Sequence, residues 1–179
     1  MSAEHRMIEH VVNALSEAVD QQRRLDVDTL HSVVEFLGTY ADRRHHEREE
    51  ALFFPLLVRR GVPPQGCPIG GLNNDHAKGR ALVATLADQI PAYAQQHPDA
   101  ERALRQTLGD IARLYRHHLW MEDAMVFPMA ERLVSEDDHQ ELLAKFIDLD
   151  RVIGPAVVAR LERFADTISF PAGGTGTAG

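Results

Sequence analysis

Two stretches of the chain combine histidine and glutamate at a spacing of one helical turn. In HHEREEALFFP, His45 stands four residues before Glu49, and the stretch ends in Phe-Pro. Further along, HLWMEDAMVFP repeats the pattern with His118 and Glu122. Residues four apart in an α-helix project from the same face. Each stretch therefore predicts an imidazole beside a carboxylate.

An imidazole and a carboxylate on each of two facing helices can form a dinuclear metal centre inside a bundle, with the carboxylates bridging the ions. Other helices should add ligands. His5 shares the apolar face of its helix, whereas His10 is turned well away, so we select His5. His76 precedes a second apolar stripe on its inward face. The predicted metal ligands are His5, His45, Glu49, His76, His118 and Glu122.

Further polar residues accompany these ligands. His46 lies about 100° around the helix from His45, where it either binds the second metal as a seventh ligand or lies at a helix interface. The acidic residues beside the ligands are either acceptors for the second ring nitrogen of a ligating histidine or solvated charges. They are Glu47, Glu50 and Asp123. We expect the histidines without a partner at ligand spacing to lie at the surface, namely His31, His97, His117 and His139.

Four long amphipathic helices would position these residues. Apolar residues recur at helical spacing in the ranges 3–22, 27–60, 75–97 and 99–133,. The Gly/Pro-rich stretch 61–74 is predicted to be a loop,. Pro55 predicts a kink near residue 51, because proline lacks the N–H that would bond the carbonyl there. Asp26 or Asp28 can cap the second helix, and Asp99 the fourth.

These elements predict an all-α fold, an up-down-up-down four-helix bundle with additional short C-terminal helices. One such helix follows a capping box formed by Ser135 and Asp138, and another follows Pro155,. We expect the bundle domain to span residues 1–150 and a C-terminal helical extension to span 151–170. The sequence PAGGTGTAG, residues 171–179, is predicted to be a disordered tail,.

The composition restricts the partners and the compartment. The net charge of -8 argues against nucleic acid and anionic membranes, which need a basic face,. No apolar run is long enough to span a bilayer, which would take about 18 residues. A lone Cys67 excludes an internal disulfide framework and suits a reducing compartment,. The first residues are amphipathic and do not resemble a signal peptide. We expect a cytoplasmic protein.

At the ligand residues, the sequence resembles the hemerythrin-like (HHE) family. Four stretches carry the resemblance, which covers about residues 3–135: EHRMIEHVVNAL, HHEREEALFFP, NDHAKGRALV and HLWMEDAMVFP. The resemblance implies that the six predicted ligands hold two iron ions in a non-haem diiron centre, with an oxo or hydroxo bridge. It also implies a four-helix bundle that binds dioxygen reversibly or reacts with nitric oxide or peroxide.

Two departures separate the chain from the oxygen-carrying hemerythrins. Those proteins have a second histidine one turn after the ligand of the third helix, where this chain has Arg80, and a His–Asp spacing of five on the last helix, where it has four. The pattern is closer to bacterial and regulatory members. In a eukaryotic iron-sensing member the residue matching His46 is itself a ligand. Iron-sulfur repair proteins of the family carry a further N-terminal domain, for which this chain has no room, so we do not expect iron-sulfur repair.

We expect a diiron protein that binds a small oxidant: dioxygen, nitric oxide or hydrogen peroxide. An apolar wall beside the site would slow the access of protons. It consists of Leu52, Phe53, Phe54, Met125, Val126 and Phe127. The alternatives are a peroxide-disproportionating, catalase-like enzyme, a protein for iron storage, sensing or donation, and a metal-free interaction bundle. Manganese or zinc tolerates similar ligands, and the sequence leaves the oligomeric state open.

Overall fold

A computed structural model describes residues 1–171, and over that range the chain is built of helices without strands. The all-α prediction is therefore confirmed. Its α-helices are α1 (Ser2–Asp20), α2 (Val27–Glu35), α3 (Phe54–Arg59), α4 (Ile69–Ala94), α5 (Ala100–Met121), α6 (Phe127–Leu133), α7 (Glu136–Ile153) and α8 (Pro155–Thr167). Three further segments are π-helical, in which each turn takes in one more residue: η1 (Phe36–His46), η2 (Glu49–Phe53) and η3 (Glu122–Val126).

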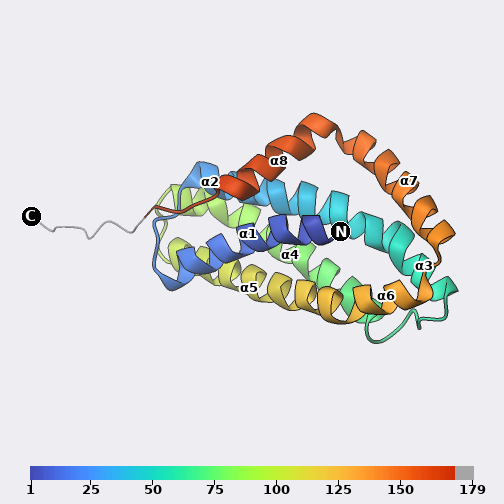
Figure 1. Cartoon of the computed structure of the whole chain (residues 1–179). Coiled ribbons are helices and arrows are strands. Elements are labelled where there is room, and N and C mark those ends of the chain that lie inside the picture. The colour runs from blue at the N-terminus through green and yellow to red at the C-terminus, as the bar shows by residue number, and fades with distance from the viewer. Residues whose placement is uncertain (172–179) are drawn as a thin grey trace, which may run out of the picture.

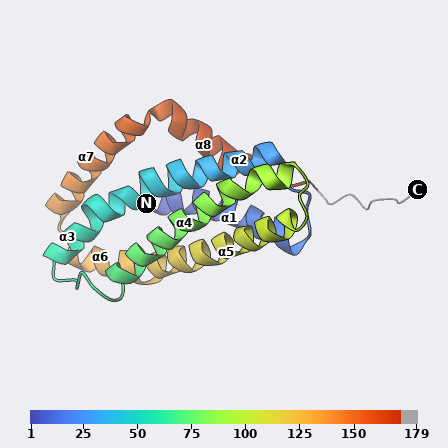
Figure 2. The ribbon, with the colours of Figure 1, turned by 180° about the vertical axis from the view of Figure 1, so that it is seen from behind.

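The elements form four rods that lie side by side (Figures 1 and 2). α1 is the first rod, α2 to α3 the second, α4 the third and α5 to α6 the fourth. α1 packs on α5, α5 on α4, α4 on α2 and η1, and η1 again on α1. The rods thus enclose a common interior, an arrangement consistent with the predicted four-helix bundle.

Local sequence explains where several helices begin. The Asp26 side chain accepts a hydrogen bond from the backbone N–H of Thr29 at 2.9 Å, which caps α2,. Ser135 and Asp138 form the predicted capping box at the start of α7,. Asp99 precedes α5 in a left-handed conformation without a side-chain cap, so its predicted capping bond is absent.

The expected kink near residue 51 takes the form of a π-helical turn. η2 covers this position, and the N–H of Phe54 bonds the carbonyl of Glu49, five residues back. η3 repeats the arrangement, with the N–H of Phe127 bonded to the carbonyl of Glu122. A prolyl ring cannot donate the regular helical bond and crowds the carbonyl four residues back. The wider turn before each Phe-Pro step accommodates that lost donor.

The loop predicted at 61–74 is wrong in its second half, because α4 already begins at Ile69. Glycines at 70 and 71 indicated a break in the sequence. In the structure, Leu72 is buried and the added helical turn packs into an apolar cluster at that end of the molecule. Burial of this apolar side chain outweighs the low helix propensity of the glycines.

α7 and α8 form an angled pair along the outside of the rods (Figure 1). α8 packs on α1 and η1, and α7 packs on η1 and η2. The additional C-terminal helices are thus present, while the division into residues 1–150 and 151–170 stays a prediction. The predicted tail lies outside the described residues except for Pro171. Among the described residues, no helix combines the length and apolarity needed to cross a bilayer.

Two apolar clusters fill the interior. The larger one joins α1, α2, η1, α4, α5 and α8 and includes Ile8, Leu37 and Leu108. The smaller one lies around the Phe-Pro steps and includes Phe54 and Val126. The predicted ligands fall between the two clusters along each rod, so apolar packing borders the polar residues on both sides.

Candidate metal centre

Five histidines and two glutamates are buried together in the interior. Their exposed fractions are at most 3%: His5, His45, His46, His76, His118, Glu49 and Glu122. α1, α4 and α5 supply one histidine each, η1 supplies two, and η2 and η3 each supply a glutamate. The structure brings together all six predicted ligands and the candidate seventh, His46. Their role as metal ligands stays a prediction at this point.

Glu122 lies among three imidazoles. Its Oε2 atom is 3.2 Å from Nε2 of His5 and 3.3 Å from Nε2 of His118. Nε2 of His45 is 3.8 Å from the same oxygen. Ligand nitrogens from α1, η1 and α5 therefore converge on one carboxylate.

Glu49 connects the two halves of the cluster. Its Oε1 is 3.5 Å from Nε2 of His45, and its Oε2 is 3.4 Å from Nε2 of His76. One carboxylate thus faces imidazoles from two rods through its two separate oxygens. A carboxylate in this position could be shared by two cations.

The ligand atoms form overlapping groups. One group contains His5 and His45, another contains His76 and His118, and both contain Glu49 and Glu122. Within each group the ligand atoms lie within 4.8 Å of one another. A third group joins His46 to His76 and His118. Two adjacent cation positions that share both carboxylates would account for all three groups.

A second set of carboxylates holds the other nitrogen of four imidazoles. Nδ1 of His5 is 2.8 Å from Asp123, and Nδ1 of His76 is 2.7 Å from Glu50. Glu50 and Asp123, left open by the sequence, therefore contact the site, whereas Glu47 is exposed to solvent. An ionised carboxylate only accepts, so each imidazole donates from Nδ1 and turns Nε2 towards the cluster.

Two further carboxylates of this kind were not predicted. Glu4 accepts from Nδ1 of His45 at 2.9 Å, and Asp42 lies 3.4 Å from Nδ1 of His46. A sequence signal existed for each: Asp42 precedes His46 by four residues, and Glu4 precedes the apolar Ile8 by four. Both patterns place a carboxylate on the inward face of a helix.

Two arginines lie beside Glu4: Arg48 in direct contact, and Arg44 with its Nη1 atom 3.7 Å from Oε1. Nη1 of the buried Arg48 donates to Glu4 Oε1 at 2.5 Å, and Nη2 donates to the backbone carbonyl of Phe146 at 3.2 Å. Arg48 also pairs with Asp150 of α7. Although burial opposes ionisation, the contacts with His45 and Arg48 lower the pKa of Glu4 to about 2. Glu4 therefore stays ionised and fixes the ring of His45.

The cluster fits a cation because its inner atoms have no other partner. Within the part of the chain that the structure describes, both carboxylates lack hydrogen bonds at all four oxygens. The histidine Nε2 atoms lack them too, as does Nδ1 of His118. Unpaired buried polar atoms are costly, and histidine nitrogen with carboxylate oxygen is a donor set that transition metals accept. Metal ions would satisfy these atoms together.

The charges lead to the same requirement. Burial and the neighbouring Glu122 raise the pKa of Glu49 well above its usual range. Burial also opposes ionisation of Glu122, but its close contacts with the imidazoles of His45, His5 and His118 outweigh burial and lower its pKa. Despite burial, the two glutamates raise the pKa of His45 to about 10. Protons thus balance the carboxylates here, and cations can replace those protons.

Two sequence expectations concern the surroundings of the site. Most of the predicted apolar wall is confirmed as buried or partly buried, but Met125 is 43% exposed and does not border the cluster. Met125 lies on the outer side of η3, whose buried residues are Glu122 and Val126. The histidines assigned to the surface are exposed, as is His10.

Residues 1–130 match the family model described as the hemerythrin HHE cation binding domain. The match covers more than half of the chain, so the chain belongs to this family. It is a hemerythrin-like cation-binding domain whose histidine and glutamate clusters are able to hold metal.

Two mycobacterial relatives are the uncharacterized proteins Rv1995 of Mycobacterium tuberculosis and Mb2018 of Mycobacterium bovis. Each is 23% identical over 151 residues, which cover 81% of this chain. The aligned residues span only 57% of either relative. No solved structure matches the chain.

Proposed function

We propose that the protein is a hemerythrin-type four-helix bundle that holds two iron ions and binds a small oxidant: dioxygen, nitric oxide or hydrogen peroxide. The observation that carries the proposal is the sharing of Glu49 and Glu122 by two groups of buried ligand atoms. Shared carboxylates are what a pair of adjacent ions needs.

The two positions differ in their ligands. His5 and His45 would serve one ion, and His76 and His118, joined by His46, would serve the other. Both ions would share the two carboxylates, so only the histidines distinguish the positions. The first would have two histidines and the second three. We therefore assign the open coordination position, where the oxidant binds, to the side of His5 and His45.

A pair of ferrous ions held there would supply the two electrons that dioxygen or hydrogen peroxide takes up, and would offer nitric oxide a coordination position. The residues of the chain supply its surroundings. Carboxylates at Nδ1 hold the imidazoles in one orientation, which fixes the distance between the two positions. The apolar clusters on both sides limit the access of water and protons, which favours reversible binding over turnover,.

Metal analysis tests the proposal. The protein purified in air is expected to contain two irons per chain, and the double variant His45→Ala/His118→Ala is expected to lose both. The matched control, His10→Ala/His117→Ala, removes two exposed histidines and should keep its iron. A native protein that contains no iron, and whose melting is unchanged by a chelator, would contradict the proposal.

Spectroscopy then separates the functions open to an iron-loaded protein. A visible charge-transfer band that forms in air and fades under vacuum supports oxidant binding. Rapid release of oxygen from added peroxide indicates the catalase-like enzyme. Iron that leaves easily, without either response, indicates storage or donation.

A further inference from the structure

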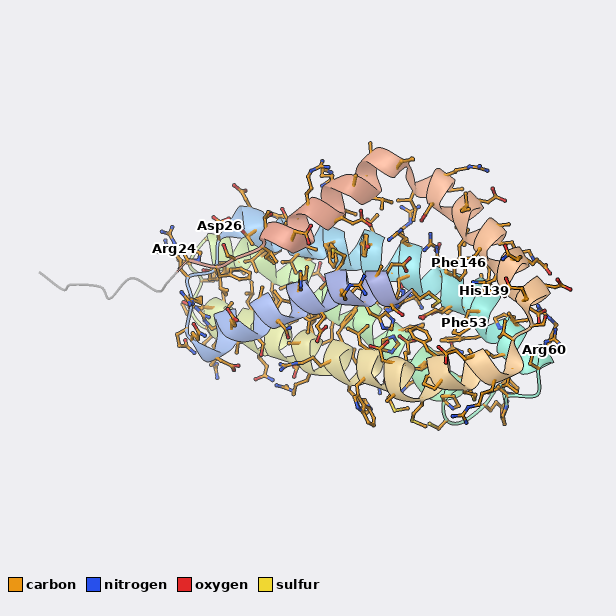
Figure 3. All side chains as sticks on the ribbon, in the orientation of Figure 1. Arg24, Asp26, Phe53, Arg60, His139 and Phe146 are labelled. Atoms are coloured by element: carbon orange, nitrogen blue, oxygen red, sulfur yellow. The ribbon has the colours of Figure 1, made fainter. Side chains whose placement is uncertain are left out.

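A largely apolar pocket of about 420 Å³ lies between α6, α7 and the first residues of the chain. Its wall includes Phe53, Phe127, Ala130, Leu142, Leu143 and Phe146. Figure 3 shows Phe53, His139 and Phe146 close together at the end of the molecule where α7 crosses the rods. Polar residues, among them Glu131, Glu136 and His139, also line the pocket.

The inner wall of the pocket touches the candidate metal centre. The ring of Phe127 stacks on the ring of His5, with 5.0 Å between centroids. The ring of Phe53 lies 6.1 Å from that of Phe127. The pocket and the ligand His5 are therefore separated by the thickness of one aromatic ring. His5 belongs to the position that has one histidine fewer.

Charged networks cover two other sides of the site. On the α4 side, Arg80 donates to Asp42 and to Glu50, each at 2.8 Å, outside His46 and His76. On the η1 side, Arg48 donates a hydrogen bond to Glu4. A small apolar molecule would gain nothing by displacing such ion pairs. The rings of Phe53 and Phe127 on the pocket side offer it dispersion contacts instead,.

We propose that this pocket is the access route by which a small uncharged oxidant such as dioxygen reaches the His5 and His45 side. The inference rests on the proposed function. Apolar cavities take up small apolar solutes readily, while a charged solute would have to shed its hydration. Rotation of the Phe127 ring would open the contact between the pocket and His5. Residues of α7 form the outer wall of the route.

Xenon tests the route without any metal, because it is an apolar probe that binds such pockets. Crystals of the metal-free protein under xenon pressure are expected to show xenon between Phe53, Phe127 and Phe146. Ala130→Phe fills the pocket from α6 and should remove that xenon. Ala84→Phe places the same ring on an exposed position of α4 and should leave it. Absence of xenon from the wild-type pocket would overturn the proposal.

Kinetics tests the route in the iron-loaded protein. Stopped-flow oxidation of the ferrous protein by dioxygen should slow about tenfold in Ala130→Phe, because filling the pocket gates access. Leu142→Trp fills the same pocket from α7 and should act alike, so a folding defect in one variant does not decide the test. Ala84→Phe should react like the wild type.

The two proposals fail in different ways. A wild-type protein without iron contradicts the diiron function, and the xenon result still reports on the pocket. If both filled variants keep two irons and react at the wild-type rate, the route is wrong while the diiron function stands. A long apolar molecule that copurifies in the pocket would also overturn the route.

Discussion

The buried Arg48 forms an ion pair with the partly exposed Asp150, and this pair connects α7 to the interior of the rods. Arg48 continues to Glu4, and Glu4 holds Nδ1 of His45. Asp150 lies beyond residues 1–130, the range that matches the family. A helix outside the family region is therefore joined to a candidate ligand through two hydrogen-bonded side chains.

Replacement of Arg48 should be among the most damaging changes in the chain. Arg48→Met removes the buried cation that pairs with Glu4 and Asp150 and leaves them only Arg44. Breaking a buried pair costs about 3–5 kcal/mol. Chemical denaturation would measure the loss. The neighbouring Arg43 is exposed, and Arg43→Met should change the free energy of unfolding by less than about 0.5 kcal/mol,. Equal effects of the two changes would show that the network contributes nothing.

Glu50 and Glu47 form a matched pair for testing how the imidazoles are held. Glu50 accepts from Nδ1 of His76, whereas Glu47 points to solvent. Loss of such a partner typically weakens metal affinity about 10–100-fold, so we expect this for Glu50→Ala. Competition with a chelator would measure it. Glu47→Ala should bind metal like the wild type, and a similar loss in both variants would contradict the assignment.

His46 decides whether the centre uses seven residues. Its Nε2 has no hydrogen-bond partner in the described residues, and its ring stacks on His76 with centroids 3.9 Å apart. We expect His46→Ala to lose part of its metal, from the His76 and His118 position, and to keep the other ion. The number of ions per chain, compared with His10→Ala, measures this. Full occupancy in His46→Ala would leave six ligands.

The cap of α2 gives a prediction for stability and pH. Asp26→Ala should cost about 1 kcal/mol, while Asp28→Ala should have little effect. Hydrogen bonds from Thr29 lower the pKa of the Asp26 carboxyl. Its contribution is therefore complete above the unfolded pKa of about 3.9 and is lost as the pH falls through the lower folded value.

Denaturation of the metal-free wild type and Asp26→Ala, followed from neutral to acid pH, would measure this contribution. The difference between the two proteins should shrink towards acid pH, as the carboxylate becomes protonated. A difference that stays constant across the range would rule out the ionised cap.

Most of the candidate site could be predicted from sequence because it depends on local spacing. A separation of four residues sets His45 beside Glu49, whatever the rest of the fold does. The contacts of Glu4 with His45 and Arg48, and of Arg48 with Asp150, depend on how distant helices pack together. Local spacing in the sequence does not predict such packing. Pro55 predicted that one helical hydrogen bond would be missing. Only the structure shows that the backbone responds with a π-helical turn.

The paired π-helical turns have a consequence for insertions and deletions. Each turn adds one residue between a glutamate and the following Phe-Pro step, and one residue corresponds to a rotation of about 100° in a helix. Because the wide turn absorbs that residue, deleting Ala51 would let the N–H of Phe54 bond the Glu49 carbonyl at the regular helical spacing, and Phe54 would keep its face,. A deletion outside the turn would instead rotate every residue beyond it. Each wide turn is thus a position where the rod can lose one residue while its candidate ligands and its aromatic lining keep facing the interior.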